Sequence, residues 1–249
     1  MKDGKRRRPK QSASGAPKPV ERVLAFAAKK DPDRIGRVGK PPKSASNVVE
    51  KLQKLLGSHY VYGGSRRRNE GHPRTWGLFD EGEYHKYTPK KSPPTPEGDN
   101  HRVLYHGTSV SRLAGILEEG LVPSSSGLLG PGIYLGGRPK AERYFRNPDA
   151  GVLLECQVAL GRVFDAVQPT FGVPAGHGSV RGVPGVTPVW QGTLREEEFL
   201  VRDKSRIAIS AIWLFKGPEN TCSHCGKSFF RSELRAIDYY RRHCAACMK

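Results

Sequence analysis

The spacing of apolar residues along the chain predicts three helices. Between Ser46, which can cap a helix, and Gly57, which can end one, apolar residues recur at helical spacing. The same spacing over 110–117 predicts a second helix, and Pro139 opens a third, short helix that ends near Arg146. Each helix would bury one apolar face against a core.

Apolar runs in the second half of the chain predict strands. In 152–160 every second residue is apolar, which is typical of a strand with one face on a core. The segment 168–193 is rich in glycine and proline, and we expect it to be a loop. Many short strands with few helices favour an α+β fold with antiparallel sheets. The expected strands are 102–105, 132–135, 152–160, 163–167, 197–201 and 207–215.

Composition divides the chain into four segments. Residues 1–45 are basic and contain little that could be buried, so we expect a disordered arm. Residues 46–100 hold the first helix and end in a proline-rich linker over 89–99. We expect the main folded domain at 101–218 and a small cysteine-rich module at 219–249.

The charge of the chain favours polyanionic partners. Its 42 Lys and Arg residues against 24 Asp and Glu give a net charge of +18, which favours nucleic acid. The basic run 5–10 is typical of nuclear localisation or of a nucleic-acid-binding arm, and a solvated tail is the alternative. The aromatic residues of 75–87 could stack on bases, but we expect them to pack onto the next domain. With no membrane-spanning apolar run and no secretory signal, we expect an intracellular protein. A nuclear location is favoured, and a cytoplasmic location is the alternative.

The first motif with candidate chemistry is Tyr105-His106-Gly107-Thr108, at the end of a predicted strand. A histidine beside a glycine at a strand end can present its ring, and a closely approaching backbone, to a ligand. A histidine with a purely structural role is the alternative.

Two further motifs bring aromatic rings and a carboxylate. Tyr134 lies on a predicted strand and Tyr144 on a predicted helix, so their rings could hold a flat aromatic cation between them. Packing of both rings in the core is the alternative. Glu198 directly precedes the apolar residues 199–201, which places its carboxylate at a sheet rim or in a cleft. A solvated acidic turn is the alternative there.

In this order, the motifs resemble the catalytic domain of the diphtheria-toxin-like ADP-ribosyltransferases, a group that includes the poly(ADP-ribose) polymerases. The matching motifs are His-Gly-Thr after a strand, Gly-Ile-Tyr-Leu, Lys-Ala-x-x-Tyr and the glutamate at a strand start, within 102–146 and 196–215. The resemblance implies split antiparallel β-sheets with short helices. It also implies transfer of ADP-ribose from NAD.

The resemblance implies an NAD site of five residues. His106 would hydrogen-bond a ribose hydroxyl, and the backbone of Gly107 would hold the nicotinamide amide. Thr108, the next residue of the motif, would also belong to the NAD site. Tyr134 and Tyr144 would sandwich the nicotinamide ring.

The resemblance also implies a catalytic set of Glu198, His106 and Tyr134. Glu198 would hydrogen-bond the 2′-hydroxyl of the nicotinamide ribose and stabilise positive charge that develops on the sugar. Glu196 is a candidate contact for the acceptor. Many members of the group have serine where Ala141 stands. We expect the absence of this serine to weaken NAD binding.

The end of the chain predicts a zinc finger. Four of the five cysteines lie in 222–249, and Cys-x₂-Cys followed by His-x₃-Cys is a spacing typical of zinc ligands. The run Cys-Gly-Lys-x-Phe resembles a ββα finger, and we expect its helix over 232–243. Cys244 is the alternative to the last ligand, and reduced cysteines without metal are the alternative to the whole site. The expected Zn²⁺ ligands are Cys222, Cys225, His243 and Cys247.

The sequence therefore predicts an enzyme that transfers ADP-ribose from NAD to a macromolecular acceptor and releases nicotinamide. The charge and the finger favour nucleic acid as the acceptor, and protein is the alternative. One rival function is an inactive relative that works as a nucleic-acid-binding module. Another is an NAD glycohydrolase with water as its acceptor.

Overall fold

The computed structural model describes residues 45–67, 82–145, 150–185, 194–217, 219–221, 228–230, 234–236 and 242–244. Its helices are α2 (Ala45–His59), α3 (Val110–Glu119) and α4 (Arg138–Glu142), and a single 3₁₀ turn spans Lys204–Arg206. The strands of the large sheet are β1 (Tyr60–Arg67), β2 (Glu83–Pro89), β3 (His101–Thr108), β4 (Ile133–Gly136), β5 (Ala150–Ala159), β6 (Val163–Ala166), β7 (Ser179–Gly182), β8 (Glu198–Val201) and β9 (Ile207–Lys216).

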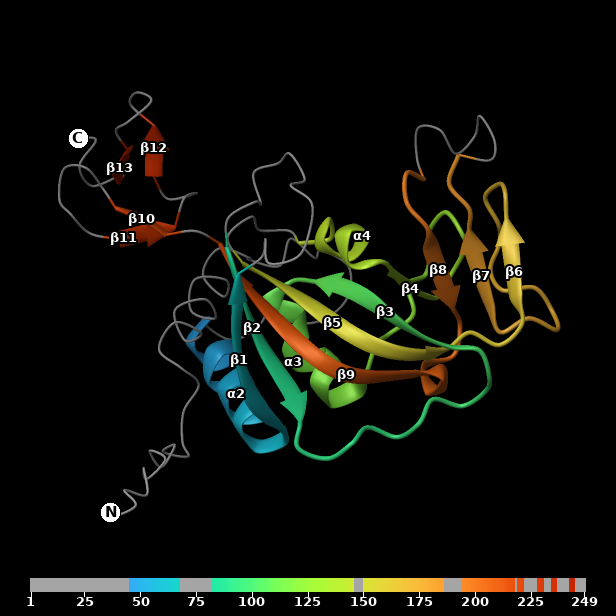
Figure 1. The fold of residues 1–249 in the computed structure, drawn as a ribbon, viewed down its shortest axis with the longest axis horizontal. Coiled ribbons are helices and arrows are strands. Elements are labelled where there is room, and N and C mark those ends of the chain that lie inside the picture. Colours follow the sequence, from blue (N-terminus) through green and yellow to red (C-terminus); the bar gives the residue numbers. More distant parts are fainter. Residues whose placement is uncertain are drawn as a thin grey trace, which may run out of the picture.

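The sheet divides into two halves that meet at one residue pair. Its strand order is β1-β2-β9-β5-β3-β4-β8-β7-β6. Among the described residues, β3 and β4 pair only at Tyr105 and Gly136. Figure 1 shows β8, β7 and β6 running in a different direction from the long strands β3, β5 and β9. The α+β class with few helices is confirmed, and the split leaves an opening between the two halves.

The largest apolar core lies between the long strands and the two longer helices. Leu52 and Leu56 of α2 and Leu113 of α3 are fully buried, in the same cluster as Val152 and Cys156 of β5. The amphipathic helix expected over 46–57 is confirmed and runs slightly further at both ends. The same cluster contains Ile133 of β4 and Phe199 of β8, so this core extends under both halves of the sheet.

The other face of the sheet packs against α4. Tyr84, Leu153 and Phe215 are completely buried there and share a cluster with Ala141 of α4. The packing expected for the aromatic residues of 75–87 is confirmed for Tyr84 and Tyr87, which are both buried. Residues 75–81 of that segment lie outside the described residues.

The segment expected to precede the main domain contributes strands to the same sheet. β1 pairs with β2, and β2 pairs with β9, all antiparallel. The proline-rich residues 90–100 therefore connect two strands of one sheet, β2 and β3. The predicted disordered arm lies outside the described residues, apart from the first residue of α2.

The loop expected over 168–193 contains a strand, so that prediction is wrong in part. β7 pairs with β8 in antiparallel register and with β6 in parallel register, which makes the sheet mixed. The two strands that flank β7, the parallel β6 and the antiparallel β8, are both distant from it in sequence. A four-residue strand among glycines and prolines has too little pattern of its own to be recognised.

The helix expected over 232–243 is also wrong. β12 (Leu234–Ala236) and β13 (Arg242–Cys244) form an antiparallel hairpin, and His243 lies opposite Arg235 within it. A second hairpin joins β10 (Glu219–Thr221) to β11 (Ser228–Phe230). Helix propensity summed over so short a segment is a weak predictor, and pairing between strands overrides it here. Cys222, Cys225 and Cys247 lie outside the described residues.

Candidate active site

A small pocket opens where β3 and β4 separate. Its walls come from β3, β4, the residues of and after α4, and the first residue of β8. At this point β3 and β4 no longer form hydrogen bonds with each other, so backbone groups and side chains of both strands can face a ligand. The residues that the sequence singled out and that line this pocket are His106, Gly107, Tyr134, Tyr144 and Glu198.

Two other predicted site residues do not line the pocket. Thr108 is buried as the last residue of β3 and lies opposite Val152 of β5. Glu196 forms an ion pair with Arg143, with 2.8 Å between Oε1 and Nη2. Glu196 is thus engaged with the segment that follows α4, beside Tyr144.

The ring of His106 is held in one orientation. Its Nδ1–H donates to the backbone carbonyl of Tyr134 at 2.9 Å, across the gap where β3 and β4 are unpaired. Because a carbonyl can only accept, Nδ1 carries the proton, and Nε2 of the neutral ring has a free lone pair. Burial lowers the pKa of His106 below its ordinary value of 6.5, outweighing the effect of that hydrogen bond. At neutral pH His106 can therefore accept a hydrogen bond from a ligand hydroxyl.

Gly107 allows α4 to approach β3 closely. A Cβ atom at this position would overlap the backbone carbonyl oxygen of Ala141, which cannot move without displacing the helix. The glycine therefore fixes the width of the pocket and leaves its own backbone accessible beside His106.

The hydroxyl of Tyr134 is anchored by the loop before β4. It donates to the carbonyl of Gly130 at 2.6 Å and accepts from the amide of Leu129 at 3.0 Å. Gly127 makes room for this hydroxyl, since a Cβ atom there would overlap it. Burial raises the pKa of Tyr134, so the hydroxyl stays protonated. These contacts fix the plane of the ring in the pocket wall.

Glu198 places a carboxylate in the buried part of the pocket. Only 3% of the residue is exposed, and its Oε1 accepts a hydrogen bond from the Tyr144 hydroxyl at 2.8 Å. The ammonium of Lys140 lies 3.4 Å from the same oxygen. Buried charges are found where such partners compensate the loss of water. The site therefore contains a partly compensated negative charge next to two aromatic rings.

Lys140 is a pocket residue that the sequence analysis did not assign. Its ammonium lies 5.9 Å from the centre of the Tyr144 ring as well as close to Glu198. The sequence feature that could have identified Lys140 is its position four residues before Tyr144. This spacing places both side chains on one face of the segment that begins with α4. Its ion-pair partner, Glu198, is remote in sequence, so the sequence alone does not predict this ion pair.

The pocket is narrow as it stands. It holds about 40 Å³, room for roughly three or four water molecules and less than an aromatic ring needs. Tyr144 is the most exposed residue of its walls, at 49%, and it follows the end of α4, so it has the most room to rotate. A ring-shaped ligand requires Tyr144 to turn away from Glu198.

Within the described ranges, no group of three or more His, Cys, Asp or Glu side chains is arranged to hold a metal ion. In the same part of the chain, no helix combines the length and the apolar character that crossing a bilayer demands.

The pocket lies within the region that matches a known family. The model of the family described as "Poly(ADP-ribose) polymerase catalytic domain" matches residues 74–210, which is more than half of the chain. That region contains β2 to β8 and all five predicted residues that line the pocket.

Individual relatives are similar over shorter stretches. Human protein mono-ADP-ribosyltransferase PARP4 is 28% identical over 160 residues, which are 57% of this chain and 9% of that protein. Poly [ADP-ribose] polymerase 1 of Danio rerio is 31% identical over 120 residues, 43% of this chain and 11% of that protein. Poly [ADP-ribose] polymerase tankyrase of Caenorhabditis elegans is 36% identical over 83 residues, 30% of this chain and 4% of that protein. The chain thus spans only about a tenth or less of these relatives, but through its matched catalytic region it belongs to the poly(ADP-ribose) polymerase catalytic-domain family.

Proposed function

We propose that this protein transfers ADP-ribose from NAD to a macromolecular acceptor and releases nicotinamide. The observation that carries the proposal is the pocket at the split of the sheet. There the buried carboxylate of Glu198 lies with the neutral ring of His106 and with Tyr134 and Tyr144. Membership of the polymerase family supports the same class of reaction.

In the proposed reaction, the bond between ribose C1′ and the nicotinamide nitrogen breaks. The bonding electron pair leaves with nicotinamide, and positive charge develops on C1′ and the ring oxygen of the sugar. Glu198 accepts a hydrogen bond from the 2′-hydroxyl and stabilises that charge, which is effective because water is largely excluded from it. The acceptor oxygen then bonds to C1′ and loses its proton.

The other pocket residues bind and orient NAD in this proposal. Nε2 of His106 accepts a hydrogen bond from a ribose hydroxyl, and the backbone of Gly107 holds the nicotinamide amide. The rings of Tyr134 and Tyr144 stack on the two faces of nicotinamide and fix the leaving group for departure. Ala141 offers no hydroxyl to the amide, so the amide depends on backbone contacts.

Nucleic acid is our favoured acceptor, with protein as the second candidate. A net charge of +18 draws polyanions to the protein, and the basic run 5–10 supports the same partner and a nuclear location. We assign the transfer reaction to residues 101–218 together with the β1–β2 edge that completes their sheet.

We further propose that the cysteine-rich end binds one Zn²⁺. The spacing of Cys222, Cys225, His243 and Cys247 supports this, with Cys244 as the alternative fourth ligand. A module of about thirty residues has little core of its own and needs such a cross-link to fold. The hairpin geometry around His243 replaces the helical arrangement expected from sequence.

One labelling experiment tests the proposed function against its rivals. Purified protein is incubated with NAD labelled in the adenylate part and with a cell lysate, and the macromolecular fraction is digested separately with nuclease and protease. Label released by nuclease supports a nucleic-acid acceptor, and label released by protease a protein acceptor. Label found only in free ADP-ribose supports a glycohydrolase. Unchanged NAD would contradict the proposal and favour an inactive binding module.

A further inference from the structure

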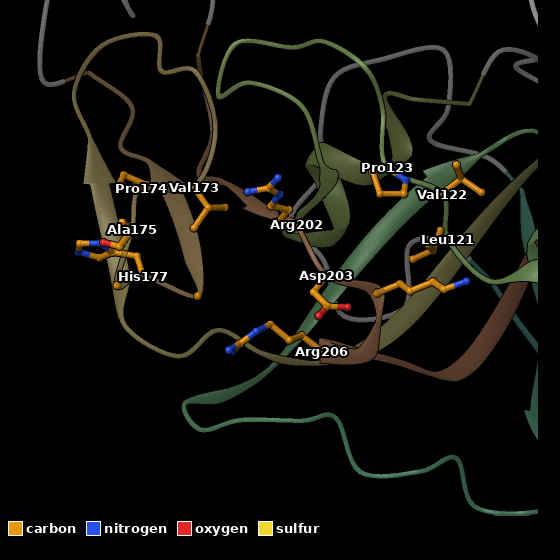
Figure 2. Close-up of a pocket in the computed structure, with 13 residues that line it drawn as sticks. Leu121, Val122, Pro123, Val173, Pro174, Ala175, His177, Arg202, Asp203 and Arg206 are labelled. Atoms are coloured by element: carbon orange, nitrogen blue, oxygen red, sulfur yellow. The ribbon is translucent and has the colours of Figure 1, made fainter.

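We propose that a second cleft, at the opposite end of β8 from Glu198, binds the sugar–phosphate backbone of a nucleic-acid strand. The cleft has a volume of about 800 Å³, within the range of protein ligand sites. It lies between the loop after α3, the loop between β6 and β7, and the turn that follows β8 (Figure 2). None of the residues proposed to bind NAD lines it.

The turn after β8 supplies three cations to the cleft. Arg202, Lys204 and Arg206 all line it. The ammonium of Lys204 lies 3.3 Å from the carbonyl of Glu119, and Nη1 of Arg206 lies 3.4 Å from the carbonyl of Ala159. These partners are neutral, so they orient the cations without cancelling their charge.

Among the described residues, Asp203 is the one acidic side chain that lines the same cleft, and it is already engaged. The carboxylate of Asp203 accepts a hydrogen bond from the backbone amide of Ser205 at 2.9 Å. That hydrogen bond is the main reason why the pKa of Asp203 is lowered, with smaller contributions from Arg206 and Lys204. The cleft therefore keeps a net positive charge even with Asp203 ionised.

Apolar side chains form the walls on either side of the cations. Figure 2 shows Val122 and Pro123 on one side and Val173 and Pro174 on the other, with Arg202 between them. Val122 is 70% exposed, so its apolar surface is accessible to a ligand in the cleft. A nucleic-acid strand offers charged phosphates in regular alternation with the apolar faces of its bases and sugars, which suits cations flanked by apolar walls. Guanidinium groups also match phosphate with paired hydrogen bonds.

The position of the cleft gives this binding a use in the proposed reaction. Arg202 directly follows β8 and lies four positions after Glu198, the first residue of that strand, a distance of about 13 Å along an extended chain. A nucleic-acid strand held at Arg202 would have neighbouring nucleotides within reach of the proposed catalytic pocket. This use rests on the proposed function, but binding in the cleft does not depend on it.

Fluorescence anisotropy with a short, labelled single-stranded DNA of mixed sequence tests the proposal without NAD and without turnover. The full chain is compared with the double variant Arg202→Gln/Lys204→Gln at several salt concentrations. We expect the variant to bind about tenfold more weakly at low salt. Its log–log salt slope should be shallower by about 1.4, because each lost phosphate contact on a single strand contributes about 0.7.

The matched control is Lys54→Gln/Lys91→Gln, which removes the same charge from exposed positions outside the cleft. Equal weakening by both double variants would show a diffuse charge effect and overturn the proposal. Absence of binding by the unchanged protein at low salt would also overturn it. Displacement of the DNA by polyglutamate at equal charge would assign the cleft to acidic proteins instead, and displacement by ADP at low concentration would assign it to a nucleoside diphosphate.

Discussion

The hydroxyl of Tyr144 donates a 2.8 Å hydrogen bond to the carboxylate of Glu198. In the proposed reaction, these two side chains contact different parts of one NAD molecule, the nicotinamide ring and its ribose. In the structure they contact each other, and the space between the walls is too small for a ring. Binding of NAD therefore exchanges the Tyr144 hydrogen bond for one from the 2′-hydroxyl of the ribose.

Replacing Glu198 by Gln should slow ADP-ribose transfer by about a hundredfold or more. The amide keeps the shape of the side chain but removes the charge that stabilises the sugar cation. The transfer rate is measured with labelled NAD, and NAD affinity is measured separately by calorimetry and should change much less. Glu197→Gln is the matched control, because Glu197 is exposed and pairs with Arg181. Full activity of Glu198→Gln would remove Glu198 from the mechanism.

Two substitutions of Tyr144 should separate its ring from its hydroxyl. Tyr144→Ala should weaken competitive aromatic amides such as benzamide by roughly 1–3 kcal/mol, the range for loss of ring stacking. Tyr144→Phe keeps the ring and releases Glu198, so these inhibitors should bind at least as well as to the unchanged protein. Inhibition constants against NAD measure both effects. If Tyr144→Ala is inhibited normally, the ring does not stack on the ligand.

Protonation of His106 should destabilise the folded protein in mild acid. Burial lowers the pKa of His106 in the folded state below 6.5, so the unfolded chain binds the proton first as the pH falls. The free energy of unfolding should be unaffected by His106 above pH 6.5 and should fall from there down to the lowered pKa. Urea titrations between pH 8 and pH 5 measure this. His106→Gln should flatten the dependence, and an unchanged slope would contradict it.

Two glycine substitutions should have opposite effects on stability. Gly107→Ala forces a methyl group into the Ala141 carbonyl and should lower the free energy of unfolding by about 1–3 kcal/mol or more. Gly115→Ala on α3 meets no atom within 4 Å and should raise it by roughly 0.5–1 kcal/mol through helix propensity. Thermal unfolding compares the two directly. A tolerated Gly107→Ala would mean that α4 is not held against β3.

Zinc content tests the cysteine-rich end. Purified protein should contain one Zn²⁺ per chain by elemental analysis, and Cys222→Ser should lose it. Comparison of Cys244→Ser with Cys247→Ser identifies the fourth ligand, since only the variant that lacks a true ligand should lose affinity. Protein purified without any stoichiometric metal would refute the site.

The main elements around the pocket could be predicted because their signals are local. The alternation over 102–105 and the apolar residues after Glu198 mark β3 and β8 by themselves. The sequence motifs also placed Tyr134 and Tyr144 on different elements. That these residues meet at a split in the sheet depends on the order of all nine strands, which no local pattern contains.

Other features escaped prediction because their partners are remote or their signals are weak. Lys140 matters through Glu198, which lies on a strand at the other end of the domain sequence. β7 exists because β6 and β8 flank it, although Ser179–Gly182 contains only one strongly strand-forming residue, Val180. The prediction of a helix at the cysteine-rich end was wrong because helix propensity, read from composition, does not include the energy of pairing between strands.

The single pair of Tyr105 and Gly136 also bears on how the two halves of the sheet stay together. Most of the ladder that would join β3 to β4 is missing, and the ring of His106 replaces one of its hydrogen bonds. NAD bound as proposed touches His106 on one half and Glu198 on the other. The substrate then adds a polar bridge between two half-sheets that otherwise share an apolar core, in which Ile133 and Phe199 pack in one cluster with Val152.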